Sequence, residues 1–162
     1  MSKKIDQDGF PLMDIQEQRE ILDIVKSFIF NVLGKPEDSV YISSFPSDNG
    51  NAFMQIKLFD LGDGDDIYLR FGKYNFDVPS EKRIVVARIG FKDKFVGNGT
   101  KLLQMLCSLG KKYNFQTLSI ECPNPNCQAF MKKLGFEKDY MQLNALKDSI
   151  HQYKTTKKAS SV

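Results

Sequence analysis

The chain carries the sequence IVVARIGFKDKFVGNGTKLL at residues 84–103. Residues 84–91 are almost continuously apolar, a pattern typical of a strand that is buried on both faces. Two glycines follow, and apolar side chains then recur at helical spacing as far as Tyr113. Residues 117–122 predict another short strand. A strand, a helix and a second strand of these lengths predict a parallel βαβ crossover.

The segments before this crossover predict one helix and three strands. Asp14 and Glu17 resemble a capping box, and the apolar residues that follow are spaced as in a helix until Gly34. The predicted strands are residues 40–45, 53–59 and 67–71. The stretch at residues 60–66 is rich in aspartate and glycine, so it predicts the loop of a hairpin. Its spacing does not match a calcium-binding loop.

The segments after the crossover predict a further helix at residues 125–134 and a strand within residues 136–143. The expected fold class is α/β of the α+β type, with three helices and a mixed, mostly antiparallel central sheet. A length of 162 residues suits one domain. We expect a flexible lead-in at residues 1–13, a single domain at residues 14–146 and a basic, disordered tail at residues 147–162.

The charge of the chain is concentrated near its end. The formal net charge is +3, and residues 147–162 carry four lysines against one aspartate, so the rest of the chain is neutral. Nucleic-acid-binding domains usually have a basic face within the fold itself, so nucleic-acid binding is not expected. The three cysteines are odd in number, no apolar signal segment follows Met1, and no apolar stretch is long enough to cross a bilayer. We therefore expect a cytoplasmic protein without a membrane span.

Gly97 and Gly99 lie where the helix of the crossover is predicted to begin. The first N–H groups of a helix lack partners within it and the helix dipole is positive there, so the backbone alone can hold an anion. The two glycines allow close approach to a phosphate, and Lys94 adds a positive charge. Glycines at such a turn also serve backbone shape alone. Their spacing matches neither a Walker loop nor a three-glycine dinucleotide fingerprint.

Two motifs in this region resemble those of the GNAT superfamily of N-acetyltransferases. Motif A of that family is a strand followed by Arg/Gln-x-x-Gly-x-Gly/Ala and a helix, and Lys94–Leu103 is similar to it, with lysine in place of arginine. Motif B is an asparagine followed eleven positions later by Gly-Phe, and Asn124–Phe136 has that spacing. The resemblance therefore covers about a third of the chain, with both motifs in family order.

The resemblance implies an acetyl-CoA-dependent N-acetyltransferase that transfers acetyl directly to an amine of a small molecule or a protein. Acetyl-CoA would be a co-substrate, no metal is implied, and a homodimer is left open. In that family CoA lies where two central strands splay apart, with its pantetheine along the first strand and its pyrophosphate on the glycine loop. The residues implied for CoA binding are Ile89, Phe91, Lys94, Phe95, Val96, Gly97, Asn98, Gly99, Thr100, Asn124 and Met131.

The predicted catalytic residue is Glu121. Glu121 and Ser119 share one face of the strand predicted at residues 117–122. Many family members carry an acidic residue on one of the two central strands, so the resemblance makes Glu121 the expected general base. The alternative is an exposed strand glutamate, or an ion-pair partner of Arg88.

The tyrosine that many family members use to protonate the CoA thiolate would fall seven residues after Asn124, where this chain has Met131. Methionine has no proton to give. Tyr113, Tyr140 or solvent remain as proton sources. The alternative interpretation is a catalytically weak or inactive GNAT-fold module that binds acyl-CoA or a protein partner.

Other residue types give weaker hypotheses. The acidic stretch at residues 60–66 favours a cationic amine as acceptor, on charge alone. A cysteine nucleophile at Cys122 or Cys127 is an alternative, although small buried cysteines are more common. His151 is the only histidine, so a histidine-based triad is not expected. The spacing of cysteine and histidine does not match a zinc site.

Overall fold

The structure, a computed structural model, describes residues 15–46, 52–59, 64–73, 82–93, 96–121, 125–136 and 138–160. The predicted lead-in at residues 1–13 and the capping position Asp14 lie outside these ranges. The elements in chain order are α1 (Ile15–Leu33), a 3-10 turn (Glu37–Ser39), β1 (Val40–Pro46), β2 (Ala52–Phe59), β3 (Asp66–Lys73), β4 (Lys82–Gly90), α2 (Asn98–Lys112), β5 (Thr117–Ile120), α3 (Pro125–Lys133), β6 (Tyr140–Gln142) and α4 (Leu143–Ser160).

The six strands form one sheet in which each strand pairs with the next strand in the chain. Every neighbouring pair is antiparallel except β4 and β5, which are parallel and joined through α2. The sheet therefore confirms the prediction of a mixed, mostly antiparallel sheet with one βαβ crossover. The parallel pair needs the long connection through α2, because the end of one strand and the start of the next lie at opposite ends of the sheet.

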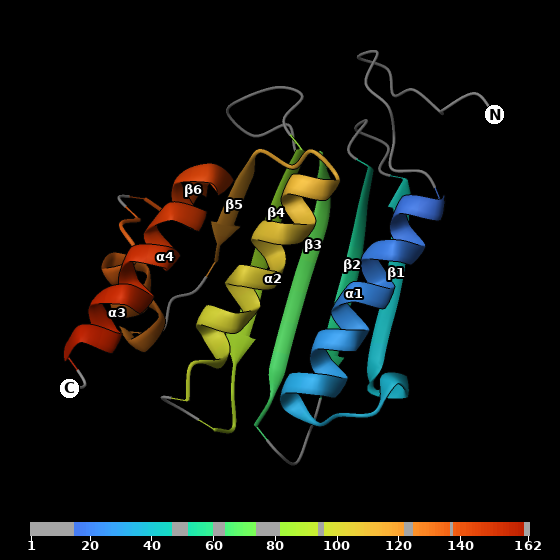
Figure 1. The fold of residues 1–162 in the computed structure, drawn as a ribbon. Coiled ribbons are helices and arrows are strands. Elements are labelled where there is room, and N and C mark those ends of the chain that lie inside the picture. The colour runs from blue at the N-terminus through green and yellow to red at the C-terminus, as the bar shows by residue number, and fades with distance from the viewer. Residues whose placement is uncertain are drawn as a thin grey trace.

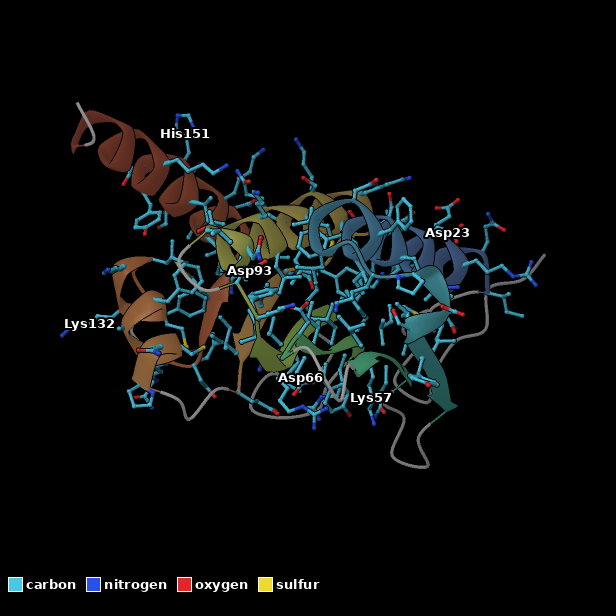
Figure 2. The ribbon with its side chains drawn as sticks, turned by 90° about the horizontal axis from the view of Figure 1, so that it is seen from below. Asp23, Lys57, Asp66, Asp93, Lys132 and His151 are labelled. Atoms are coloured by element: carbon cyan, nitrogen blue, oxygen red, sulfur yellow. The ribbon has the colours of Figure 1, made fainter. Side chains whose placement is uncertain are left out.

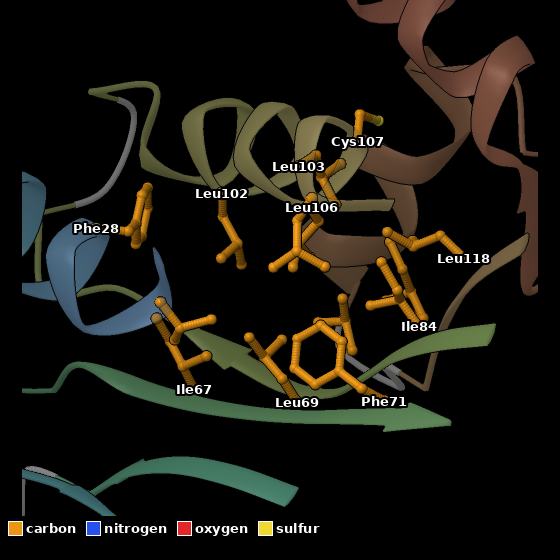
Figure 3. Close-up of a cluster of buried hydrophobic side chains, with 14 of the residues drawn as sticks. Phe28, Ile67, Leu69, Phe71, Ile84, Leu102, Leu103, Leu106, Cys107 and Leu118 are labelled. Atoms are coloured by element: carbon orange, nitrogen blue, oxygen red, sulfur yellow. The ribbon is translucent and has the colours of Figure 1, made fainter. Parts of the chain in front are cut away.

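The helices α1, α2 and α4 cover one face of the sheet (Figure 1). The strands alternate to match this layer, and on β3 the side chains of Ile67, Leu69 and Phe71 are buried beneath the helices while those between them point away. Figure 3 shows the leucines of α2 above these strand residues. Burial of each large apolar side chain contributes about 1.5–3 kcal/mol to folding.

The opposite face carries the polar half of the alternation. Figure 2 shows Lys57 and Asp66 on the side of the sheet opposite to Asp23 of α1 and His151 of α4. One residue departs from this pattern: Val85 of β4 lies on the polar face and is nevertheless buried. The predicted burial of residues 84–91 on both faces therefore holds only for the first part of β4, since Arg88 is exposed.

The end of the chain differs from the prediction. Residues 143–160 form helix α4, so the disordered tail predicted at residues 147–162 is wrong as far as residue 160, and the described residues form four helices rather than three. Leu146 and Ile150 lie one turn apart and are buried, and Lys154 donates a hydrogen bond of 2.8 Å to Gln104 of α2. The strand predicted within residues 136–143 is limited to Tyr140–Gln142, because the chain turns into α4 directly after it.

The packing of α4 gives a stability prediction. Ile150→Ala removes a side chain that is 2% exposed, so we expect the free energy of unfolding to fall by about 2–4 kcal/mol. The matched control is His151→Ala, the next residue on the same helix, whose side chain is exposed and whose loss should cost less than about 1 kcal/mol. Urea unfolding followed by circular dichroism measures both. Equal effects of the two substitutions would contradict a docked α4.

Candidate functional site

The two parallel strands separate before β4 ends. β5 pairs with β4 from Arg83 to Val86, and the N–H of Glu121 then donates a bond of 2.9 Å to the carbonyl of Val86. β3 pairs with β4 as far as Gly90, with a register shift part of the way along. Within the described ranges, residues 87–90 therefore have a partner strand on one edge only. A ligand lying along the other edge would meet a row of backbone hydrogen-bonding groups.

Helix α2 begins at the same end of the sheet as the carboxyl end of β4 (Figure 1). Gly97 precedes it in the left-handed conformation, with a φ of 84°, which a residue with a side chain adopts only with strain. The first bond of the helix runs from the N–H of Lys101 to the carbonyl of Gly97 over 3.0 Å. The N–H groups of the preceding turn have no acceptor within the helix, so this end of α2 suits an anion.

Gly99 allows α3 to approach the first turn of α2. A β-carbon at Gly99 would lie 3.3 Å from a ring carbon of Phe130, which is tighter than ordinary contact. Helices α2 and α3 therefore meet at the glycine pair. This contact brings the two predicted motifs together in space, although they lie about 30 residues apart in the chain.

The structure places most of the residues predicted to bind CoA around this end of the sheet. Ile89 and Phe91 are half-buried and pack against the core from the open half of β4 and the residue that follows it. Asn98 and Thr100 are buried in the first turn of α2, and Val96 is exposed. Lys94, Phe95 and Asn124 lie outside the described residues.

Met131 lies on α3 and is buried, with 8% of its surface exposed. It lines a shallow hollow of about 330 Å³ together with Gln128, Lys132, Phe136 and Lys138. All five residues belong to α3 or to the segment after it, so this hollow does not include the open edge of β4. Met131 is also part of the hydrophobic core, which agrees with a packing role for this side chain.

Glu121 follows β5 directly and its side chain is half exposed. Its carboxylate forms an ion pair of 2.5 Å with the guanidinium of Arg70 on β3, on the face of the sheet that α1, α2 and α4 leave uncovered. The ion-pair partner named from the sequence was Arg88, and this is wrong. Arg88 instead pairs with Asp66 through its Nε atom, over 2.8 Å. The two acidic groups thus each neutralise one arginine.

Three cations surround the ring of Tyr68 on the same face. The distances to the ring centroid are 4.6 Å for Lys57, 5.6 Å for Arg70 and 5.7 Å for Arg88. Strand register explains the grouping, because Lys57 and Arg88 are the direct cross-strand neighbours of Tyr68 and Arg70 lies two residues further along β3. We call Lys57, Tyr68, Arg70 and Arg88 the Tyr68 cluster. The sequence prediction missed it, although the polar residues alternate with apolar ones through β3.

The described carboxylates of the β2–β3 hairpin already have partners within the chain. Asp65 is buried, and it accepts a bond of 2.9 Å from the N–H of Lys92 and lies 3.7 Å from the ammonium of Lys35. Asp66 pairs with Arg88. These two carboxylates therefore do not support the hypothesis of a cationic acceptor. The other acidic residues of the hairpin lie outside the described residues.

The two tyrosines considered as proton donors lie in different surroundings. Tyr113 follows α2 at the end opposite to the glycine pair, and its hydroxyl donates to the carboxylate of Glu20. Burial and the bond to Glu20 raise the pKa of Tyr113, and the same bond lowers the pKa of Glu20. Tyr113 is therefore a poor acid, and it lies far from the glycine pair. Tyr140 is exposed and is the cross-strand neighbour of Ser119, with Arg83 at 5.5 Å from its ring.

Cysteine and metal chemistry gain no support within the described part of the chain. Burial raises the pKa of Cys107 to about 11, which makes it a poor nucleophile at neutral pH. Cys127 is half-buried on α3, and Cys122 lies outside the described residues. No group of three histidine, cysteine, aspartate or glutamate residues gathers in the described ranges as a metal site requires.

The hydroxyl of Ser119 is a buried polar group that has no hydrogen-bond partner in the described structure. Such a hydroxyl has lost its water without regaining a bond, so Ser119→Ala should leave the free energy of unfolding unchanged or raise it by about 1 kcal/mol. The control is Thr117→Val, because Thr117 Oγ1 accepts a bond from Gln142 and its loss should cost about 1 kcal/mol. Chemical unfolding of both variants measures the difference. A loss above about 1 kcal/mol for Ser119→Ala would show that the hydroxyl has a partner in solution.

Comparisons of the chain with protein-family models, with curated proteins and with solved structures found no match. None of the helices in the described ranges is both long enough and apolar enough to span a membrane.

Proposed function

We propose that the chain is an acetyl-CoA-dependent N-acyltransferase of the GNAT type. One observation carries the proposal: the open edge of β4 and the N-terminus of α2 lie at the same end of the sheet. Acetyl-CoA has an extended arm with two amides, which suits a strand edge, and a pyrophosphate, which suits a helix N-terminus. In open sheets with parallel strands, ligands generally bind at the carboxyl ends of those strands.

The proposed reaction is direct transfer. The amine nitrogen attacks the thioester carbonyl carbon, an amide C–N bond forms, the C–S bond breaks, and CoA leaves as a thiolate. The amine loses one proton, which passes by way of a base to the thiolate or to solvent. Glu121 is the proposed base, because its own N–H marks the point where β4 and β5 part. Alignment of the two substrates supplies much of the acceleration, and the base about 10²–10⁴-fold.

A second candidate is a module that binds acyl-CoA without efficient turnover. Met131 supports it, since this side chain is buried and has no proton to give at the position where the resemblance expects an acid. The two candidates share the CoA site and differ in whether an amine acceptor causes release of CoA.

The CoA site is tested by Gly97→Glu. A carboxylate at the start of α2 would repel a pyrophosphate, so we expect acetyl-CoA binding measured by calorimetry to be lost in the variant. Absence of binding to the unchanged protein at millimolar acetyl-CoA would remove the basis of both candidates.

Gly34→Glu is the matched control for this substitution. Gly34 also has a positive φ, of 68°, and a β-carbon at either glycine would meet no atom within 4 Å. The two substitutions therefore impose similar backbone strain, and only one of them lies at α2. Acetyl-CoA should bind to Gly34→Glu as it binds to the unchanged protein. Equal loss in both variants would mean that strain, rather than the anion site, caused the effect.

The role of Glu121 is tested by Glu121→Gln. If Glu121 is the base, kcat falls by about 10²-fold or more in an assay of thiol release, whereas acetyl-CoA binding stays unchanged. Arg70→Gln is the companion variant, because it breaks the same ion pair and leaves the carboxylate in place. Rates within about twofold of normal for Glu121→Gln would assign this residue to positioning Arg70 rather than to proton transfer.

A further inference from the structure

The Tyr68 cluster lies next to the point where β4 and β5 part. Arg70 is the cross-strand neighbour of Val85 on β4, one residue before the last paired position. Its ion-pair partner Glu121 is bonded through its N–H to Val86. Arg88 belongs to the open half of β4. The cluster and the open edge are therefore parts of one surface.

Among its described residues, this surface has more positive than negative charge. Lys57, Arg70 and Arg88 face two carboxylates, those of Glu121 and Asp66. Within the described residues Lys57 forms no ion pair with a carboxylate, and its ammonium lies over the ring of Tyr68. A cation held over an aromatic face keeps its positive charge. The Tyr68 cluster thus holds three cations against two neighbouring carboxylates, which leaves one positive charge in excess.

The cations are also accessible. The side chains of Arg88 and Glu121 are each 50% exposed, and Arg70 is 21% exposed. Figure 2 shows Lys57 on the face of the sheet away from the helix layer. An anionic group of a ligand can therefore reach Arg88 and Lys57, while the carboxylate of Glu121 remains within reach of a cationic or amine group beside it.

We infer that the acceptor is a small amine that itself carries a carboxylate. Its carboxylate binds Arg88 and Lys57 beside Tyr68, and its amine lies towards Glu121 at the parting of β4 and β5. Guanidinium groups bind carboxylates through paired hydrogen bonds, which fixes the orientation of the ligand as well as its charge. This inference rests on the proposed function for the transfer step, in which the amine nitrogen replaces the CoA sulfur on the acetyl carbon. It replaces the cationic acceptor that the acidic hairpin suggested.

The first test compares glycine with glycinamide as acceptors in a thiol-release assay. The ratio of their kcat/KM values is measured in the unchanged protein and in Lys57→Met and Arg88→Gln, so that intrinsic differences between the two amines cancel. We expect the ratio to fall about tenfold or more in each variant, because each loses a charge-assisted contact with the carboxylate. Lys111→Gln is the control: it removes the same charge from the exposed last turn of α2 and should leave the ratio unchanged.

The second test needs no turnover. N-acetylglycine and N-acetylglycinamide, the two products, are titrated separately while the side-chain Nε–H signals of Arg70 and Arg88 are followed by NMR. N-acetylglycine should move the Arg88 signal, N-acetylglycinamide should not, and Lys57→Met should weaken the response.

The two tests separate failure of the inference from failure of the proposed function. If acetyl-CoA binds and glycinamide is acetylated, but neither variant changes the ratio and N-acetylglycine moves no arginine signal, the carboxylate acceptor is excluded and the acyltransferase stands. If N-acetylglycine moves Arg88 but acetyl-CoA does not bind, the anion site stands and the acyltransferase falls.

Discussion

The packing of α2 on the sheet rests on three fully buried leucines, Leu102, Leu103 and Leu106. Removal of one such side chain typically costs 2–5 kcal/mol, a large part of the stability of a small domain. Further along α2, a β-carbon at Gly110 would lie 2.5 Å from Leu143 of α4, so helix, sheet and α4 meet there without spare room. The position of α2 is thereby fixed at both its apolar face and its far end. As a result, the glycine pair is held at the end of β4.

The open edge of β4 places only a modest demand on stability. An unpaired backbone group is costly when it is also hidden from water. The paired part of β4 is where Ile84, Val85 and Val86 are buried, whereas Ala87 is half-buried and Arg88 is exposed. Water therefore reaches the strand where β5 no longer protects it. Because the residues of β4 change from buried to exposed along the strand, β4 can pair with β5 in its first half and leave its backbone groups open to water in its second half.

The order of elements could be predicted from the sequence because periodicity is a local property. The apolar run at residues 84–86 and the helical spacing after Gly99 are sufficient for the strand and the helix, and the length of the connection makes the strands parallel. Helix α4 was missed because its lysines dominate the composition of residues 147–162. Its apolar residues Leu146 and Ile150 are few, and they become informative only when α2 is there to cover them.

The candidate site was predictable only in part, for a reason of geometry. Gly97 and Gly99 are neighbours in sequence, so their position at the start of a helix could be predicted. The partner of Glu121 depends on β3, β4 and β5 together, and the register shift between β3 and β4 changes which residues align. The alternation within one strand predicts which face Glu121 or Arg88 lies on. It cannot predict which residues of the neighbouring strand stand opposite, because the register shift changes that alignment. The Tyr68 cluster is assembled in the same way, from three strands, and so it has no signature in any one segment.

Met131 cannot donate a proton, but this alone does not exclude the proposed acyl transfer. A thiol has a pKa of about 8.5, so a CoA thiolate can leave without a strong acid and collect its proton from solvent. The open edge of β4 and the exposed side chain of Glu121 keep the region next to water, which makes solvent an adequate source. Tyr113 cannot serve instead, because its hydroxyl donates a hydrogen bond to Glu20 and lies at the end of α2 opposite to the glycine pair. The proposed reaction would require the protein to align the amine with the thioester. The strand edge, the helix terminus and the Tyr68 cluster are each suited to hold one part of these substrates.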